Sequence, residues 1–288
     1  MKELNLIKEL RDSTQAGMND CKKALIEAAW DLNKAKELII ARGLKVSADR
    51  DTKLACEGFV FVEKRNGSVL LFEANCQTDF VAKSDLFKQF VKDVADNMFN
   101  GVDFSNNEKL KTDLSLKTGE KISIRNIFVT KDDNETHNYI YSHSGKIGVV
   151  VTLSTKYTNS HIDSMGKNLA MQVAAMNPLA ISSDKLDLKT ISSQEAIFKT
   201  QLLEANKPEQ SWEKIIAGKF NKWYTDVCLL EQESIHFPKK SIKSLFLSMN
   251  SNYSDNVVSI NNFIRVAVGD GLNKKEENLA EEVSRMLK

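Results

Sequence analysis

The sequence predicts an α+β protein in which a small group of helices precedes a body of mixed strands and helices. Three short runs with a helical spacing of apolar residues occupy the first 43 residues. Asn66-Gly67 then separates two strand-like runs, which is the strongest short signal for a β-hairpin. Residues 67–98 can also be aligned with residues 145–176 without a gap, so the body is expected to contain two related strand–strand–helix halves.

Composition places the chain among soluble globular proteins. It has 288 residues, of which 42% are hydrophobic and 27% are charged, enough for two or three units with a sizeable core. The net charge of +1 and the short, flanked lysine pairs argue against direct nucleic-acid binding. We find no apolar run of signal-peptide or membrane-spanning length, so a cytoplasmic protein without membrane contact is expected.

The residues that usually carry chemistry form no recognisable constellation. The four cysteines lack a C-x-x-C pair, which favours free thiols in a reducing cytosol, and the four histidines lack metal-ligand spacing. We find no P-loop, G-x-G-x-x-G, G-x-S-x-G or H-E-x-x-H motif. The sequence therefore predicts a protein that is not an enzyme and that holds neither a metal nor a cofactor.

The N-terminal segment, 1–45, is expected to form three short helices. The first carries Leu6 and Leu10, the second is capped near Asn19, and the third is capped at Asp31 and stops at Gly43. So small a unit buries only a marginal core. It serves either as a partner-docking module or as a bundle that covers the main body, and residues 46–55 are expected to link it to that body.

The main body is expected to comprise one subdomain at 56–135 and a second at 136–272. A helical hairpin at about 190–220 is inserted in the second subdomain, where Ser192 to Glu195 reads as a capping box. Pro208 can begin the second helix of the hairpin, and Gly218 is expected to follow that helix. The last segment, 273–288, has the apolar spacing of an amphipathic helix, with Leu279, Val283, Met286 and Leu287 on one face.

One stretch, Asn75–Lys83, needs a separate explanation. It joins a strand-like run to a helix-like run, and Thr78 or Asp79 can cap a helix that begins here. Two apolar neighbours, Phe80 and Val81, follow directly after this polar turn. A cap explains the polar residues of this stretch, but it does not explain the Phe-Val pair.

Two arrangements of this stretch are compatible with the sequence. If one helix runs unbroken from Asp79, Phe80 falls on the apolar face of that helix and belongs to the core. If the helix is interrupted at Ser84-Asp85, Phe80 and Val81 lie on a projecting turn that is available to a partner. The aligned second half has Lys156-Tyr157-Thr158-Asn159 at the equivalent positions, so the scaffold does not need this motif, which favours a role in binding.

Several of these segments together resemble the bacterial elongation factor Ts family, the guanine-nucleotide exchange factors for elongation factor Tu. The resemblance covers nearly the whole chain. It rests on five motifs: TQAGMNDCKKAL at 14–25, NCQTDFVAK at 75–83, GKIGVVV at 145–151, DVCLLEQ at 226–232 and FIRVAVGDG at 263–271.

The resemblance implies a ubiquitin-associated-like N-terminal domain, a core of two related α+β subdomains with antiparallel strands, a protruding helical hairpin and a C-terminal helical module. It implies that the partner is elongation factor Tu, and that the chain needs no nucleotide site of its own. In the family, a Thr-Asp-Phe-Val motif intrudes on the GTPase and disturbs its Mg²⁺ site. That role falls on Thr78, Asp79, Phe80 and Val81.

Other possibilities remain open on the sequence. One aromatic side chain contributes too little binding energy for exchange, so further contacts are expected, with Met18, Lys22, Lys23 and Val283 as candidates. A cytosolic thiol-dependent enzyme centred on Cys76 is a second hypothesis, although no histidine lies near it in sequence to act as a base. A third is a scaffold whose N-terminal bundle binds other partners. The inserted hairpin could pair with a second copy of the chain or with the partner.

Overall fold

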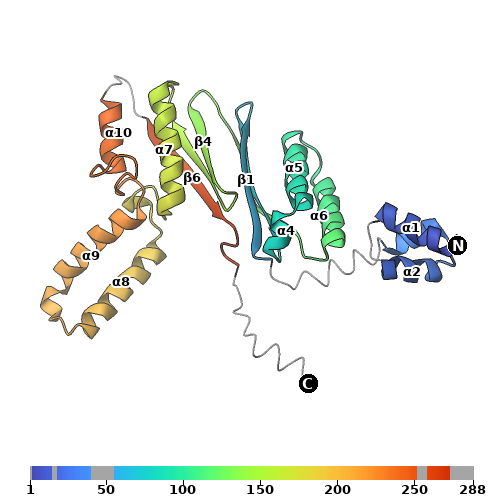
Figure 1. The fold of residues 1–288 in the computed structure, drawn as a ribbon. Coiled ribbons are helices and arrows are strands. Elements are labelled where there is room, and N and C mark those ends of the chain that lie inside the picture. Colours follow the sequence, from blue (N-terminus) through green and yellow to red (C-terminus); the bar gives the residue numbers. More distant parts are fainter. Residues whose placement is uncertain (1, 15–17, 40–54, 252–257, 273–288) are drawn as a thin grey trace. The chain divides into compact units, whose positions relative to one another are not determined.

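The structure is a computed structural model that describes residues 2–14, 18–39, 55–251 and 258–272. It has mixed helices and strands (Figure 1), and the strands of the described part form two three-stranded sheets, which confirms the predicted α+β class. The chain divides into two compact units. Unit 1 comprises residues 1–61, 72–127 and 267–288, and unit 2 comprises residues 62–71 and 128–266.

The N-terminal helices pack around a small core of their own. They are α1 (Lys2–Thr14), α2 (Met18–Glu27) and a third helix that includes residues 32–39. The Asp31 carboxylate caps the third helix, because it accepts hydrogen bonds from the backbone N–H groups of Asn33 and Lys34 at 2.9 and 3.1 Å. The expected cap at Asn19 is wrong, since α2 already begins at Met18. The buried residues are Leu10, Cys21, Ala24, Leu25, Ala28, Ala35 and Ile39.

Residues 40–54 lie outside the described part, and they include the expected helix end at Gly43 and most of the expected linker. The expected C-terminal helix at 273–288 lies outside it as well. None of the helices in the described residues has both the length and the apolar character needed to cross a bilayer.

The first sheet has the strand order β1 (Glu57–Arg65), β2 (Ser68–Cys76), β3 (Ser123–Lys131). Asn66 and Gly67 both have positive φ angles, +49° and +80°, as the predicted two-residue hairpin turn requires. Helices α5 (Asp85–Phe99) and α6 (Phe104–Thr118) follow β2 and lie side by side (Figure 1). The face of α5 that is buried carries Phe87, Phe90, Val91, Val94 and Ala95.

A buried ionic network joins β2 to β3 in unit 1. Glu73 has no exposed surface, and its carboxylate accepts hydrogen bonds from Asn75, Arg125 and Asn126 at 2.6, 3.0 and 2.8 Å. It also accepts one from the backbone N–H of Gly269 at 2.8 Å. A buried carboxylate is tolerated only when it is paired and hydrogen-bonded, and this network also holds the backbone at Gly269 against the first sheet.

The second sheet has the order β4 (Thr136–His143), β5 (Ile147–Ser154), β6 (Ser259–Ala267), and β4 pairs with β5 antiparallel. Ser144 and Gly145 again have positive φ angles, +51° and +66°. Helix α7 (Ser160–Met176) packs against β4 and β5. The two aligned sequence segments therefore adopt the same order of hairpin strand and helix.

The helical hairpin of unit 2 consists of α8 (Leu188–Glu204) and α9 (Trp212–Val227). The short 3₁₀ helix η1 (Ser183–Lys185) precedes α8, and a second one, η2 (Glu209–Ser211), lies between the two helices. Helix α10 (Ile242–Asn250) follows α9 in the sequence. The expected capping box is wrong, because Ser192 lies inside α8 and its hydroxyl donates to the carbonyl of Leu188 at 2.8 Å. The expected break at Gly218 is wrong as well. A glycine inside a helix costs only about 1 kcal/mol, and the packing of Phe220 against Phe198 offsets that cost.

The N-cap of α7 provides a test of this local structure. The Asn159 side chain accepts hydrogen bonds from the backbone N–H groups of His161 and Ile162 at 3.0 and 3.1 Å. Asn159→Ala is expected to lower the free energy of unfolding by about 1 kcal/mol, because two N–H groups lose their acceptor. Equilibrium urea unfolding measures the loss. Ser164→Ala, on the exposed surface of the same helix, is the control and should change stability by less than about 0.5 kcal/mol.

Candidate functional site

The candidate site is the turn between β2 and α5, which we call the 78–84 turn. It contains the five-residue helix α4 (Asp79–Lys83), which lies at one end of α5 (Figure 1). Thr78 is the N-cap, and its side chain accepts a hydrogen bond from the backbone N–H of Val81 at 3.3 Å. None of the α4 residues is fully buried, and only Val81 and Ala82 among its apolar residues are half-buried, so hydrophobic packing holds this helix weakly.

Ser84 interrupts the helix and decides between the two arrangements. Its backbone is extended, with φ −67° and ψ 151°, so it is at once the C-cap of α4 and the N-cap of α5. Its N–H and its hydroxyl both donate to the Val81 carbonyl, at 3.0 and 2.7 Å, and the hydroxyl accepts from the Phe87 N–H at 3.2 Å. One serine therefore satisfies the end of one helix and the start of the next.

Phe80 projects from the protein as a result. Its side chain is 82% exposed, so the unbroken helix with Phe80 in the core is wrong, and the projecting turn is confirmed. Val81 is half-buried and Thr78 is exposed. In the second half of the body, α7 begins at Ser160 without a comparable preceding helix, so the projecting turn belongs to the first half. A phenylalanine this exposed adds little hydrophobic stabilisation to the free protein, because that stabilisation scales with the apolar area removed from water.

Glu120 holds the 78–84 turn from a distant part of the sequence. Its carboxylate accepts hydrogen bonds from the backbone N–H groups of Gln77 and Thr78 at 2.9 and 3.0 Å, and from the Thr78 hydroxyl at 2.5 Å. The sequence interpretation did not include Glu120. Its only local signal is its place directly after Gly119, the left-handed C-cap of α6 with φ +77°.

Asp79 and Lys83 form an ion pair along one side of α4, at 2.7 Å. The Lys83 ammonium lowers the pKa of the Asp79 carboxyl, and the carboxylate raises the pKa of Lys83. Both groups are exposed to solvent, so the pair contributes little to stability. The Asp79–Lys83 pair makes one face of α4 charged, whereas Phe80 on the same helix is apolar.

Cys76 is buried directly beneath this turn. It has no exposed surface, and its thiol donates to the Thr78 carbonyl at 3.2 Å. A cysteine nucleophile needs an accessible thiolate, so this environment suits a structural residue. Among the described residues, no group of three or more His, Cys, Asp and Glu side chains is placed to hold a metal ion.

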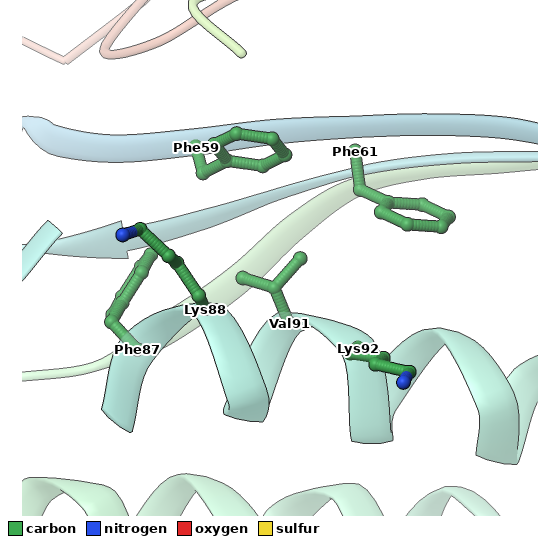
Figure 2. A pocket seen from close by; sticks show the side chains of 6 residues that line it. All are labelled: Phe59, Phe61, Phe87, Lys88, Val91 and Lys92. Atoms are coloured by element: carbon green, nitrogen blue, oxygen red, sulfur yellow. The ribbon is translucent and has the colours of Figure 1, made fainter. Parts of the chain in front are cut away.

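Unit 1 also contains a small apolar groove of about 180 Å³ between β1 and α5 (Figure 2). Phe59 and Phe61 line it from the strand, and Phe87 and Val91 line it from the helix. Lys88 and Lys92 complete the lining. The polar lining of this groove consists of two lysines, one of which pairs with Asp85 at 3.3 Å, and the groove has no nucleophile beside a base, so we do not assign the function to it.

The other residues suggested as partner contacts form a separate group. Met18, Lys22 and Lys23 lie on the exposed face of α2, where Met18 is 53% exposed. Ile26, which the sequence interpretation did not include, lies on the same face and is 56% exposed. Val283 lies outside the described residues.

Comparisons with known proteins agree on one family. The profile described as Elongation factor TS matches residues 77–270. Elongation factor Ts of Clostridioides difficile (strain 630) is 35% identical over 98% of this chain and 98% of its own length. Elongation factor Ts of Clostridium botulinum (strain Alaska E43 / Type E3) is 34% identical over 98% of this chain and 97% of its own. On this evidence the chain belongs to the elongation factor Ts family of translation factors.

Proposed function

We propose that this chain promotes the release of GDP from elongation factor Tu by protein contact alone, with the 78–84 turn approaching the Mg²⁺ and phosphate site of the GTPase. The observation that carries the proposal is the 82% exposure of Phe80 on a short, capped helix. Membership of the family supplies the partner. No group on this chain needs to react or to hold the nucleotide.

The chemistry of Mg²⁺ supports insertion at this site. Mg²⁺ requires near-ideal octahedral geometry and is shared between protein oxygens and nucleotide phosphates. A side chain that displaces the surrounding backbone slightly therefore weakens metal and nucleotide binding together. Phe80 suits this task because its ring is rigid and gains about 2–3 kcal/mol when a partner buries it.

That gain is too small to account for exchange without further contacts. A GDP affinity near nanomolar corresponds to about 12 kcal/mol, and fast release requires several kcal/mol of weakening. The exposed face of α2, with Met18, Lys22 and Lys23, is the described surface that we propose for a second contact. Val283 remains a candidate outside the described residues.

The alternatives have weaker support. A thiol-dependent enzyme centred on Cys76 would need the thiol to reach a substrate, and that side chain is fully buried. A scaffold that binds other partners through its N-terminal helices leaves the exposure of Phe80 unexplained.

Linkage between the two ligands gives a direct test. Whatever this chain removes from the affinity of the GTPase for GDP, GDP must remove equally from the affinity of the GTPase for this chain. We expect binding to nucleotide-free elongation factor Tu to be tighter than binding to the GDP complex by at least about 100-fold. Isothermal titration with both forms measures this ratio. Equal affinity for the two forms would contradict the proposed function.

A further inference from the structure

We propose that Glu120 is a positioning residue for nucleotide exchange, which it serves by holding the 78–84 turn in the conformation that presents Phe80. This inference rests on the proposed function and adds a residue to it. Glu120 would not touch the nucleotide or the metal, and its effect would pass through Thr78 to the aromatic side chain.

Apart from Glu120, few contacts hold the 78–84 turn in place. Helix α4 is five residues long and has no buried residue, and isolated helices of this length are unstable in water. The Thr78 and Ser84 caps are local bonds that move with the turn. In the part of the chain that the structure describes, every hydrogen bond that reaches residues 77–84 from a sequence-distant residue comes from Glu120.

The hydrogen bond between the Thr78 hydroxyl and Glu120 has a defined direction. An ionised carboxylate only accepts hydrogen bonds, so the hydroxyl must donate its proton to Glu120. The lone pairs of the same oxygen are then left for the Val81 N–H, which is the cap of α4. The Glu120 carboxylate thus orients both the Thr78 cap of α4 and the chain that follows β2. The hydrogen bond from Thr78 to Glu120 and the one from Val81 to Thr78 strengthen each other.

Local hydrogen bonds fix the backbone of Glu120 at the end of α6. Its carbonyl accepts from the Ser115 hydroxyl at 2.6 Å, and its N–H donates to the Thr118 hydroxyl at 3.3 Å. Gly119 before it adopts φ +77°, which a glycine takes at no steric cost. The Glu120 side chain therefore links the C-terminal end of α6 to the 78–84 turn.

An ordered 78–84 turn lowers the entropy cost of binding the partner. If the turn is already ordered in the free protein, that entropy need not be lost when the partner binds. Without the carboxylate, the turn would fluctuate and Phe80 would be presented only part of the time. The rate of exchange would fall although Phe80 itself is unchanged.

The test is a double-mutant cycle between Glu120→Gln and Phe80→Ala, read as the second-order rate of labelled-GDP release from elongation factor Tu. The glutamine amide keeps one acceptor oxygen. Either the Thr78 hydroxyl or the backbone N–H groups of Gln77 and Thr78 therefore lose their acceptor. Glu120→Asp keeps the negative charge, but its side chain is one methylene shorter, so the carboxylate lies farther from the 78–84 turn. Glu108→Gln, on exposed α6 surface paired with Lys111, is the matched control.

Glu120→Gln and Glu120→Asp are each expected to slow exchange about 5-fold, as the loss of ordinary hydrogen bonds predicts. In the Phe80→Ala background the same changes should have less than about a 2-fold effect, which a general structural role would not produce. Hydrogen exchange at the Gln77 and Thr78 amides should accelerate, while the thermal midpoint should fall by no more than about 4 °C, because the lost bonds are confined to the turn.

The outcomes separate the two proposals. If Phe80→Ala exchanges nucleotide as fast as the native protein, the proposed function of the turn fails. If Phe80→Ala is slow but Glu120→Gln has no effect, or has the same effect in both backgrounds, the positioning role is overturned and the proposed function stands.

Discussion

Phe80→Ala is expected to slow the release of GDP from elongation factor Tu by about 30- to 160-fold. Burial of a phenylalanine side chain gains roughly 2–3 kcal/mol, and the loss of that energy corresponds to a rate ratio of this size. The change should leave folding intact, because the side chain is 82% exposed and contributes little to the core. Stopped-flow fluorescence of a labelled GDP measures the rate.

Two comparisons make this result specific. Leu188→Ala truncates another apolar side chain, 77% exposed on α8, and should leave the rate unchanged within about 2-fold. Cys76→Ser should retain exchange, because a thiol buried beneath the turn takes no part in it. Full loss of function in Cys76→Ser together with a harmless Phe80→Ala would instead support the thiol-dependent enzyme.

Glu73→Ala is expected to destabilise unit 1 by about 3–5 kcal/mol. Removing one partner of a buried ion pair leaves the other uncompensated, and here Arg125 would lose its carboxylate. The side chains of Asn75 and Asn126 and the Gly269 N–H would lose acceptors as well. The loss should fall toward the lower value, because the Arg125 side chain is 25% exposed and can be partly rehydrated.

Guanidinium unfolding followed by circular dichroism measures this effect. Glu108→Gln removes a carboxylate from an exposed pair on α6 and should cost less than about 1 kcal/mol. Glu73→Gln keeps one acceptor and should lie between the two. A Glu73→Ala protein with native stability would show that water replaces the carboxylate in this network.

The sequence predicted much of the fold because many of its signals are local. Asn66-Gly67 specified a hairpin because both residues take positive φ angles at low cost. Asp31 was recognised as a cap from its own side chain and its neighbours. The gapless alignment of residues 67–98 with 145–176 anticipated a hairpin strand and a helix in each half, since equal patterns fold equally.

Helix boundaries were predicted less well, for a physical reason. Ser192 to Glu195 has the residues of a capping box, but the helix begins at Leu188, and the Ser192 hydroxyl donates to the Leu188 carbonyl inside it. Gly218 has the residue type of a helix end, but tertiary packing of Phe220 continues the helix through it. In both places a weak local preference yields to packing that the sequence pattern does not show.

The sequence by itself determined the class of fold, the family and the position of the Thr78–Val81 motif. Only the tertiary structure decided that Phe80 faces solvent, because Ser84 could have continued the helix or interrupted it with similar local cost. Only the tertiary structure brought Glu120 to Thr78, across 42 residues of sequence. Local patterns report the conformation of a few neighbouring residues, whereas a contact between distant segments depends on how the whole unit packs.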